Sequence, residues 1–311
     1  MQYRQLGTSS LQVSEISLGS WRTFGTTVDA GTAAQCVRTA FDCGINFFDT
    51  ANMYGKGAAE HLLGSLLSAY RRDDYVLATK LYYPMSEADR GLSRAQVFKQ
   101  IDASLRRLGV DHVDLYQCHR CDAETPLEET MEALTDIVRS GKARYVGFSE
   151  WPASEIKRAR AIDGAVTFVS SQPRYSMLYR KNERRIFPLC RDLGIGQIVW
   201  SPLAQGILTG KYKPFEAAPP GSRGARKGLG RFFRPPVLQA VGNLQEIAAD
   251  LSLTLPQLAL AWVLRGDLVS SAIIGASRPD QIVMNCGASG VELEATVLQR
   301  IDAVLDQVMR R

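Results

Sequence analysis

The chain has 311 residues, of which 45% are hydrophobic and 22% are charged, the composition of an ordinary soluble globular protein. Its formal net charge of +5 is a small excess for this length and does not favour nucleic-acid binding. No apolar run approaches the ~18 residues of a membrane helix. The N-terminal MQYRQLGTSSLQ has no signal-peptide pattern, so we expect a cytoplasmic protein that spans no membrane. Because α/β barrels often exceed ~250 residues as one unit, we expect a single domain over residues 1–311.

Six cysteines are scattered along the chain without the pattern of a secreted disulfide scaffold, which is typical of reduced thiols. One local pattern, Cys118-x-x-Cys121, has the spacing of a redox pair or of half a zinc site. A zinc site needs further ligands, but the chain has no second C-x-x-C, and the histidines outside this motif are His61 and His112. We therefore expect no metal.

Short apolar runs alternate with segments of helical periodicity along most of the chain. A polar turn at 7–10 predicts an N-terminal β-hairpin. Eight strands are predicted after it, at residues 14–19, 45–49, 75–80, 113–118, 144–149, 167–172, 197–201 and 271–275. Amphipathic helices are predicted at 32–43, 93–108 and 127–140, and a last helix at 293–310. Thr125 and Glu128 have the spacing of a capping box at the start of the helix at 127–140.

This alternation predicts right-handed βαβ units and a parallel sheet. Eight strands with no long linker between units favour a closed barrel over an open doubly wound sheet, and no G-x-G-x-x-G follows the first strand. The predicted fold is therefore α/β, a (β/α)8 TIM barrel with an N-terminal β-hairpin and an extra C-terminal helix. The stretch 202–236, rich in Gly, Pro and Arg, is the one long irregular segment, and such loops are usually functional or disordered.

Polar residues close the predicted strands. In a (β/α)8 barrel the C-terminal strand ends build the active site, so Asp49, Lys80 and His119 would converge on one mouth. Tyr54 follows Asp49 by five residues in the adjoining loop. Taken singly, Asp49 and Lys80 could be a structural ion pair, Tyr54 a packed aromatic residue and His119 an ordinary strand-end residue. Their joint placement favours a catalytic site.

Six segments in this order resemble those of the aldo-keto reductase superfamily: GINFFDTANMYG, VDHVDLYQCHR, GKARYVGFSEW, SSQPRYSML, WSPLAQGILTGKY and IIGASRPDQIVMN. Within the superfamily the chain looks closest to the bacterial branch related to potassium-channel beta subunits. The set Asp49, Tyr54, Lys80 and His119 resembles the catalytic tetrad of these enzymes. The resemblance implies an NADPH-dependent oxidoreductase that reduces aldehydes or ketones to alcohols, with small carbonyl compounds, and neither nucleic acid nor membrane, as partners.

The resemblance also implies a role for each member of the tetrad. Tyr54 would be the general acid, and a cationic Lys80 beside it would lower the pKa of the phenol from its usual value near ~10. Asp49 would keep Lys80 charged and aimed, and His119 would donate a hydrogen bond to the substrate oxygen.

Residues for NADPH/NADP+ follow from the same resemblance. Ser20, Trp21 and Asp49 would lie near the nicotinamide ribose, and Ser149 and Gln172 would contact the carboxamide. The pyrophosphate would lie along Trp200, Ser201, Pro202, Leu203, Gln205 and Gly206, with Lys211 and Arg223 as cationic partners. The adenine and 2′-phosphate end would be held by Gly275, Ser277, Arg278, Gln281 and Asn285. Met284 stands where relatives often have Glu, which puts the adenine amino contact in doubt.

Substrate would contact Trp21, Tyr54, Tyr82, His119 and Trp151. The stretch 221–234 carries Arg223, Arg226, Lys227, Arg231 and Arg234, and it either folds over the cofactor or is a solvated loop.

Two other interpretations compete with the reductase. A nicotinamide-binding, redox-sensing subunit with slow turnover would resemble the channel subunits, but those carry Asn at the position of His119, which favours an enzyme here. A cofactor-free barrel isomerase or aldolase that uses Lys80 would leave WSPLAQG and GASRPDQ unexplained.

Overall fold

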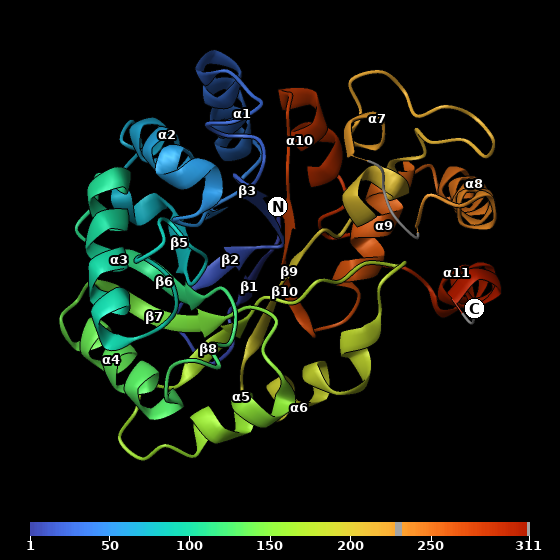
Figure 1. The fold of residues 1–311 in the computed structure, drawn as a ribbon. Helices are drawn as coiled ribbons and strands as arrows, with labels where there is room; N and C mark the ends of the chain where they lie inside the picture. Colours follow the sequence, from blue (N-terminus) through green and yellow to red (C-terminus); the bar gives the residue numbers. More distant parts are fainter. Residues whose placement is uncertain (228–231, 310–311) are drawn as a thin grey trace.

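The computed structural model describes residues 1–227 and 232–309. Eight parallel strands form a closed barrel in the order β10-β3-β4-β5-β6-β7-β8-β9 (Figure 1). The strands are β3 (Ile16–Gly19), β4 (Phe47–Asp49), β5 (Val76–Leu81), β6 (Val113–Cys118), β7 (Ala143–Phe148), β8 (Phe168–Ser171), β9 (Gly196–Trp200) and β10 (Val269–Ile274). Each of them overlaps one of the eight predicted strands, so the predicted (β/α)8 barrel is confirmed.

An antiparallel hairpin precedes the barrel, as predicted, with β1 (Tyr3–Gln5) paired to β2 (Gln12–Ser14). The predicted first barrel strand began at Ser14, but this residue ends β2. Leu6, Leu11 and Val13 of the hairpin region pack in one apolar cluster with barrel residues from several strands. The apolar interior of the barrel is therefore continuous with the hairpin.

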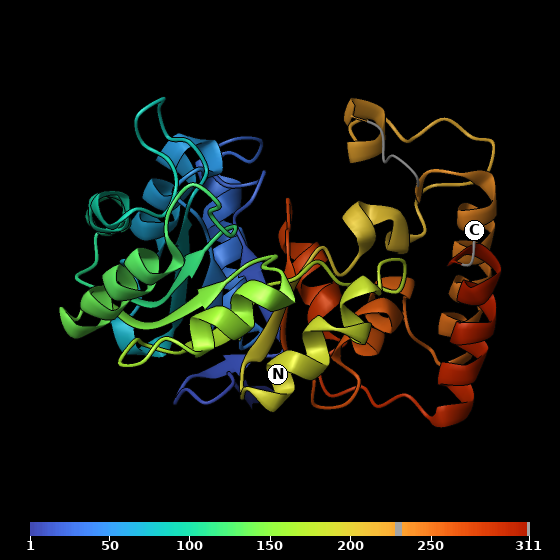
Figure 2. The ribbon, with the colours of Figure 1, turned by 60° about the horizontal axis from the view of Figure 1, so that its bottom comes forward.

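Helices surround the barrel. They are α1 (Ala30–Asp42), α2 (Ala58–Leu67), α3 (Arg94–Leu108), α4 (Leu127–Arg139), α5 (Ala153–Arg160), α6 (Ile186–Asp192), α9 (Leu255–Leu264) and α10 (Pro279–Cys286). Outside this ring, α8 (Pro235–Asp250) packs against α11 (Ala295–Met309), and Figure 2 shows the two side by side at one edge of the molecule. Helix α11 confirms the predicted C-terminal helix.

The predicted capping box at α4 is wrong. Pro126 takes the N-cap position and makes no side-chain capping bond. The Thr125 hydroxyl instead donates a hydrogen bond of 2.8 Å to Asp122 Oδ2. A capping box does form at α9, between Thr254 and Gln257.

In the described part of the chain, no single helix is long and apolar enough to cross a membrane. Helices α8 and α9 meet these criteria by length and composition only when they are joined across an 88° bend.

The long segment after β9 contains two short helices, η4 (Ala204–Thr209) and α7 (Arg223–Lys227). The backbone N–H of Gly224 donates to the hydroxyl of the buried Tyr212, which ties α7 to the beginning of the segment. The Arg223 guanidinium lies 5.2 Å from the centre of the Trp21 ring, on the loop after β3. The segment therefore contacts a loop from another part of the barrel mouth. Arg231 of the predicted basic set lies outside the described residues.

Candidate active site

Three predicted catalytic residues stand where neighbouring strands end. Asp49 is the last residue of β4, Lys80 is the last but one residue of β5, and His119 directly follows β6. Tyr54 opens the short helix η1 (Tyr54–Gly57) just beyond β4. Because parallel strands end at the same rim, the barrel brings these side chains together. Their exposed fractions are 9% or less, so the cluster is nearly dehydrated.

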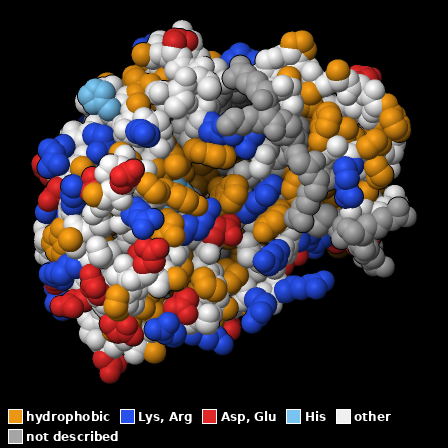
Figure 3. Space-filling model, viewed as in Figure 1, with side chains coloured by type: hydrophobic (Ala, Val, Ile, Leu, Met, Phe, Trp, Pro, Cys, Tyr) orange, Lys and Arg blue, Asp and Glu red, His pale blue; other side chains and the backbone are white. Residues whose placement is uncertain are grey.

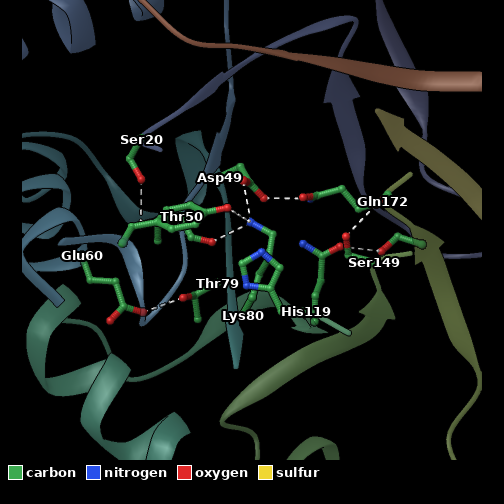
Figure 4. A network of polar contacts seen from close by, with 12 residues as sticks. Ser20, Asp49, Thr50, Glu60, Thr79, Lys80, His119, Ser149 and Gln172 are labelled. Atoms are coloured by element: carbon green, nitrogen blue, oxygen red, sulfur yellow. Dashed lines mark hydrogen bonds and ion pairs between the residues drawn. The ribbon is translucent and has the colours of Figure 1, made fainter. Parts of the chain in front are cut away.

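The ammonium group of Lys80 is the centre of this cluster (Figure 4). Lys80 Nζ lies 2.6 Å from Asp49 Oδ2, 2.8 Å from the carbonyl oxygen of Thr50 and 3.5 Å from the Tyr54 hydroxyl. These three oxygens match the three donors of an ammonium group. Lys80 is thus held between a carboxylate and a phenol, the arrangement that the resemblance implied.

The pKa values in the cluster follow from burial and charge. Burial lowers the pKa of Lys80, while the Asp49 carboxylate, and more weakly Glu60, oppose this change. The expectation that the pKa of Tyr54 is lowered is wrong in sign. Burial raises the pKa of Tyr54 well above its usual range and Asp49 raises it further, while Arg120 opposes both. Tyr54 is therefore protonated at neutral pH.

His119 stacks edge-on against two tyrosines, with ring-centre distances of 5.7 Å to Tyr54 and 4.9 Å to Tyr83. Burial, together with the positive charges of Lys80 and Arg120, holds the pKa of His119 well below its usual range. The imidazole is therefore neutral at physiological pH. Its buried Nδ1 atom has no hydrogen-bond partner in the described part of the protein, so one ring nitrogen is available to a ligand.

The residues predicted for the carboxamide adjoin this cluster. Gln172 Nε2 donates a hydrogen bond of 2.9 Å to Asp49 Oδ1, and Ser149 Oγ donates one of 2.8 Å to the carbonyl oxygen of Gln172 (Figure 4). Ser20 Oγ donates to Thr50 Oγ1, next to the carbonyl that binds Lys80. Two predicted cofactor residues therefore share one polar network with the tetrad, and a third borders it.

Backbone strain collects at the same end of the barrel. Most non-glycine residues with positive φ follow a barrel strand: Arg22, Lys56, Tyr82, Glu150, Ser201, Ala204 and Gln205. Such conformations persist only where the surroundings enforce them, and they are common at ligand sites. One of them, Glu150, accepts hydrogen bonds from the Arg174 backbone N–H and from Trp200 Nε1. The strained loop after β7 therefore fixes the end of β9.

The predicted pyrophosphate residues run from the end of β9 into η4: Trp200, Ser201, Pro202, Leu203, Gln205 and Gly206. Gly206 has φ +95°, and a Cβ there would lie 3.4 Å from Lys211 Nζ, so this lysine is beside the loop. Burial lowers the pKa of Arg223, and so do Arg22 and then Arg174. Sequence reasoning missed Arg22 and Arg174 as neighbours of Arg223. Arg22 could have been predicted at the site, because it directly follows Trp21, which was predicted there.

At the predicted adenine end, Ser277, Gln281 and Arg278 lie around the start of α10, while Gly275 follows β10 and Asn285 is buried in the last turn. Gln281 Oε1 accepts a hydrogen bond of 2.8 Å from the Ser277 backbone N–H. Both Arg278 and Met284 are exposed. Asp280, which was not among the predicted site residues, contacts Arg278.

The predicted substrate residues have different surroundings. Trp21 is 40% exposed, and the half-buried Tyr82 packs edge-on against Tyr83. Trp151 is only 3% exposed and packs against Phe148 and Phe168, so the structure does not bring its indole into the open mouth. Figure 3 shows a hollow near the centre of the face that it views, with hydrophobic and basic side chains around it.

The Cys118-x-x-Cys121 pattern holds two free thiols. Burial raises the pKa of the Cys121 thiol to about 11, which disfavours the thiolate that a metal or a redox reaction needs. Within residues 1–227 and 232–309 there is no group of three or more His, Cys, Asp or Glu side chains that could hold a metal ion.

Known proteins are similar to this chain over nearly its whole length. A protein of Arabidopsis thaliana, named a probable voltage-gated potassium channel subunit beta, is 40% identical over 100% of this chain and 98% of its own length. A protein of the same name from Oryza sativa subsp. japonica is 39% identical over the same shares. The structure of a glycerol dehydrogenase from Gluconobacter oxydans matches with a TM-score of 0.87 and 25% identity, over 99% of this chain and 96% of that one. Residues 15–306 match the Aldo/keto reductase family, and the chain belongs to this family.

Proposed function

We propose that this protein is an NADPH-dependent reductase of aldehydes or ketones. Family membership supports oxidoreductase activity. The observation that carries the proposal is the position of the Lys80 ammonium, 2.6 Å from Asp49 and 3.5 Å from the Tyr54 hydroxyl in a nearly dehydrated mouth. A buried ion pair alone would be poor support for catalysis. Here the ammonium also contacts the Tyr54 hydroxyl, which carries a proton.

The residues present fit a nicotinamide dinucleotide. The orphaned His119 Nδ1 offers a buried polar atom to a ligand, and Gly206, Lys211 and Arg223 combine a glycine loop with two cations. In the proposal, Ser149 and Gln172 hold the carboxamide, the 200–206 loop with Lys211 and Arg223 holds the diphosphate, and Arg278 and Asn285 hold the adenosine 2′-phosphate end. The chemistry that the cofactor supplies is hydride transfer to the carbonyl carbon.

Tyr54 serves as the general acid. Since its pKa is raised, the phenol carries its proton at neutral pH and can donate it to the carbonyl oxygen as negative charge develops there. The adjacent Lys80 ammonium stabilises the phenolate that remains, at a distance of 3.5 Å. Asp49 holds Lys80 in its charged form and in place, because burial alone would favour the neutral amine.

His119 orients the carbonyl group. A neutral imidazole carries one N–H donor, which in this proposal binds the substrate oxygen beside Tyr54. Its edge-on contacts with Tyr54 and Tyr83 limit the rotation of the ring.

The test is consumption of NADPH, followed at 340 nm (the usual wavelength for reduced nicotinamide), across aldehydes and ketones of different size and charge. We expect steady turnover with at least one class of carbonyl compound, and a loss of turnover in Tyr54→Phe. Tight NADPH binding without reduction of any compound would contradict the proposal.

A redox-sensing subunit with slow turnover is the second candidate, and the names of the potassium-channel relatives favour it. A pre-steady-state experiment, with NADPH and carbonyl compound both in excess over the protein, separates the two candidates. A sensor would oxidise bound NADPH once and then release NADP+ slowly, whereas an enzyme would continue through repeated cycles at a rate near that of its first.

A further inference from the structure

Arg278 and Asp280 form a two-bond ion pair at the start of α10. Arg278 Nε lies 3.1 Å from Asp280 Oδ1, and Arg278 Nη2 lies 3.1 Å from Asp280 Oδ2. Both side chains are largely exposed, at 63% and 59%. The hydrogen bonds from Arg278 lower the pKa of Asp280, so the carboxylate is ionised at neutral pH. The guanidinium therefore presents its paired donors to a group within its own chain.

A phosphate group uses the same donors. Arginine binds phosphate and carboxylate alike through two parallel N–H bonds, so Asp280 and a phosphate would compete for Arg278. The Asp280 carboxylate would also repel a phosphate placed beside it. A second predicted phosphate donor is engaged as well, since the Ser277 backbone N–H and hydroxyl both point to Gln281 Oε1.

We propose that Asp280 weakens the selectivity of this protein for NADPH over NADH, by occupying the arginine that would bind the 2′-phosphate. The inference rests on the proposed function, because it takes Arg278 as the 2′-phosphate partner. A bidentate arginine contact ordinarily separates the two nucleotides by about ten- to hundredfold. Competition from Asp280 makes this separation smaller, so the preference for NADPH over NADH is reduced.

The alternative role for Asp280 is structural. It stands in the first turn of α10, where an acidic side chain stabilises a helix. A purely structural aspartate would affect both nucleotides equally when it is replaced, because α10 carries residues predicted for the adenine as well. The ratio of the two affinities therefore separates selectivity from helix stability.

The experiment measures the dissociation constants of adenosine 2′,5′-bisphosphate and adenosine 5′-monophosphate by calorimetry, and those of NADPH and NADH by fluorescence. The proteins are wild type, Asp280→Asn, Arg278→Gln and the double variant. Asp250→Asn is the matched control, since Asp250 is 58% exposed and pairs with Arg300 at 2.6 Å between α8 and α11. Its affinity ratios should equal those of the wild type.

We expect Asp280→Asn to tighten binding of the 2′-phosphorylated nucleotide roughly two- to fivefold relative to the nucleotide that lacks the 2′-phosphate, the scale of releasing one exposed ion pair. In the Arg278→Gln background most of this gain should disappear. An unchanged or smaller ratio in Asp280→Asn would overturn the inference, and so would an equal gain without Arg278.

These binding measurements do not depend on carbonyl reduction. If the ratio shifts as expected while no carbonyl compound is reduced, the proposed catalytic function fails and the role of Asp280 stands. If NADPH drives reduction while the ratio does not shift, the inference alone fails. If neither nucleotide binds the wild type, both fail together.

Discussion

Gln172 reaches across the barrel mouth to Asp49. Its Nε2 atom donates a hydrogen bond of 2.9 Å to Asp49 Oδ1, while Lys80 holds the other carboxylate oxygen at 2.6 Å. Gln172 directly follows β8, which stands opposite β4 in the closed strand order. Both oxygens of a buried carboxylate are thus satisfied from two walls of the barrel, which fixes its orientation and, through it, that of Lys80.

Replacing Lys80 tests how strongly this arrangement depends on paired charge. Lys80→Met should lower the free energy of unfolding by about 3–5 kcal/mol, because it leaves the buried Asp49 carboxylate without a counter-charge. The double variant Asp49→Asn/Lys80→Met should recover part of this loss, since no buried charge remains. Urea unfolding of wild type, both single variants and the double variant measures the coupling. Strictly additive losses would show that the two side chains do not act as a pair.

Tyr54→Phe tests the general acid. The substitution removes one hydroxyl and keeps the ring that packs against His119, so the fold and nucleotide affinity should persist. Turnover should fall by about 10²–10⁴-fold, the usual contribution of general acid–base catalysis. The measurement is the steady-state rate of NADPH oxidation, with nucleotide affinity followed separately by fluorescence. A rate within a few-fold of wild type would mean that another group donates the proton.

The barrel and its polar rim could be predicted because buried parallel strands read as apolar runs, and the residue that closes each run marks the rim. Asp49 and Lys80 were found in this way, since each interrupts or ends such a run. The hairpin was visible as a turn, but its end at Ser14 was not, because the apolar pattern continues from β2 into β3 without a break.

Features that depend on burial or on loop conformation could not be predicted. The sign of the Tyr54 pKa change is set by desolvation, which outweighs nearby charge and is invisible in local sequence. Thr125 has the spacing of a capping residue, yet its hydroxyl binds Asp122. The contact of Arg278 with Asp280 depends on the rotamers of two exposed side chains, for which a sequence holds no periodic signal.

His119→Asn tests whether the imidazole acts on the reacting carbonyl. Asparagine keeps a hydrogen-bond donor but changes its reach and removes the edge-on contacts with Tyr54 and Tyr83. NADPH affinity should stay near wild type while carbonyl reduction slows at least ~10²-fold, the scale of losing one oriented donor. Single-turnover NADPH oxidation gives the rate. If wild type is no faster than the variant, the sensor function is favoured over the enzyme.

The lowered pKa of His119 predicts a pH-dependent stability. An unfolded imidazole binds a proton below pH ~6.5, whereas the folded one, buried beside Lys80 and Arg120, does not. Protons therefore favour the unfolded chain, and the free energy of unfolding should fall below pH ~6.5 by up to ~1.4 kcal/mol per pH unit on account of this group. Above that pH its contribution is fully present.

The measurement is the urea midpoint between pH 5 and 7.5 for wild type and His119→Asn. The variant should lose less stability than wild type toward pH 5, because it lacks the group that takes up the proton on unfolding. The exposed His61 supplies the matched control, because His61→Asn makes the same exchange of imidazole for amide outside the cluster. Parallel slopes in wild type and His119→Asn would mean that the folded imidazole titrates like an exposed one, and the neutral donor proposed for catalysis would then be only partly populated near pH 6.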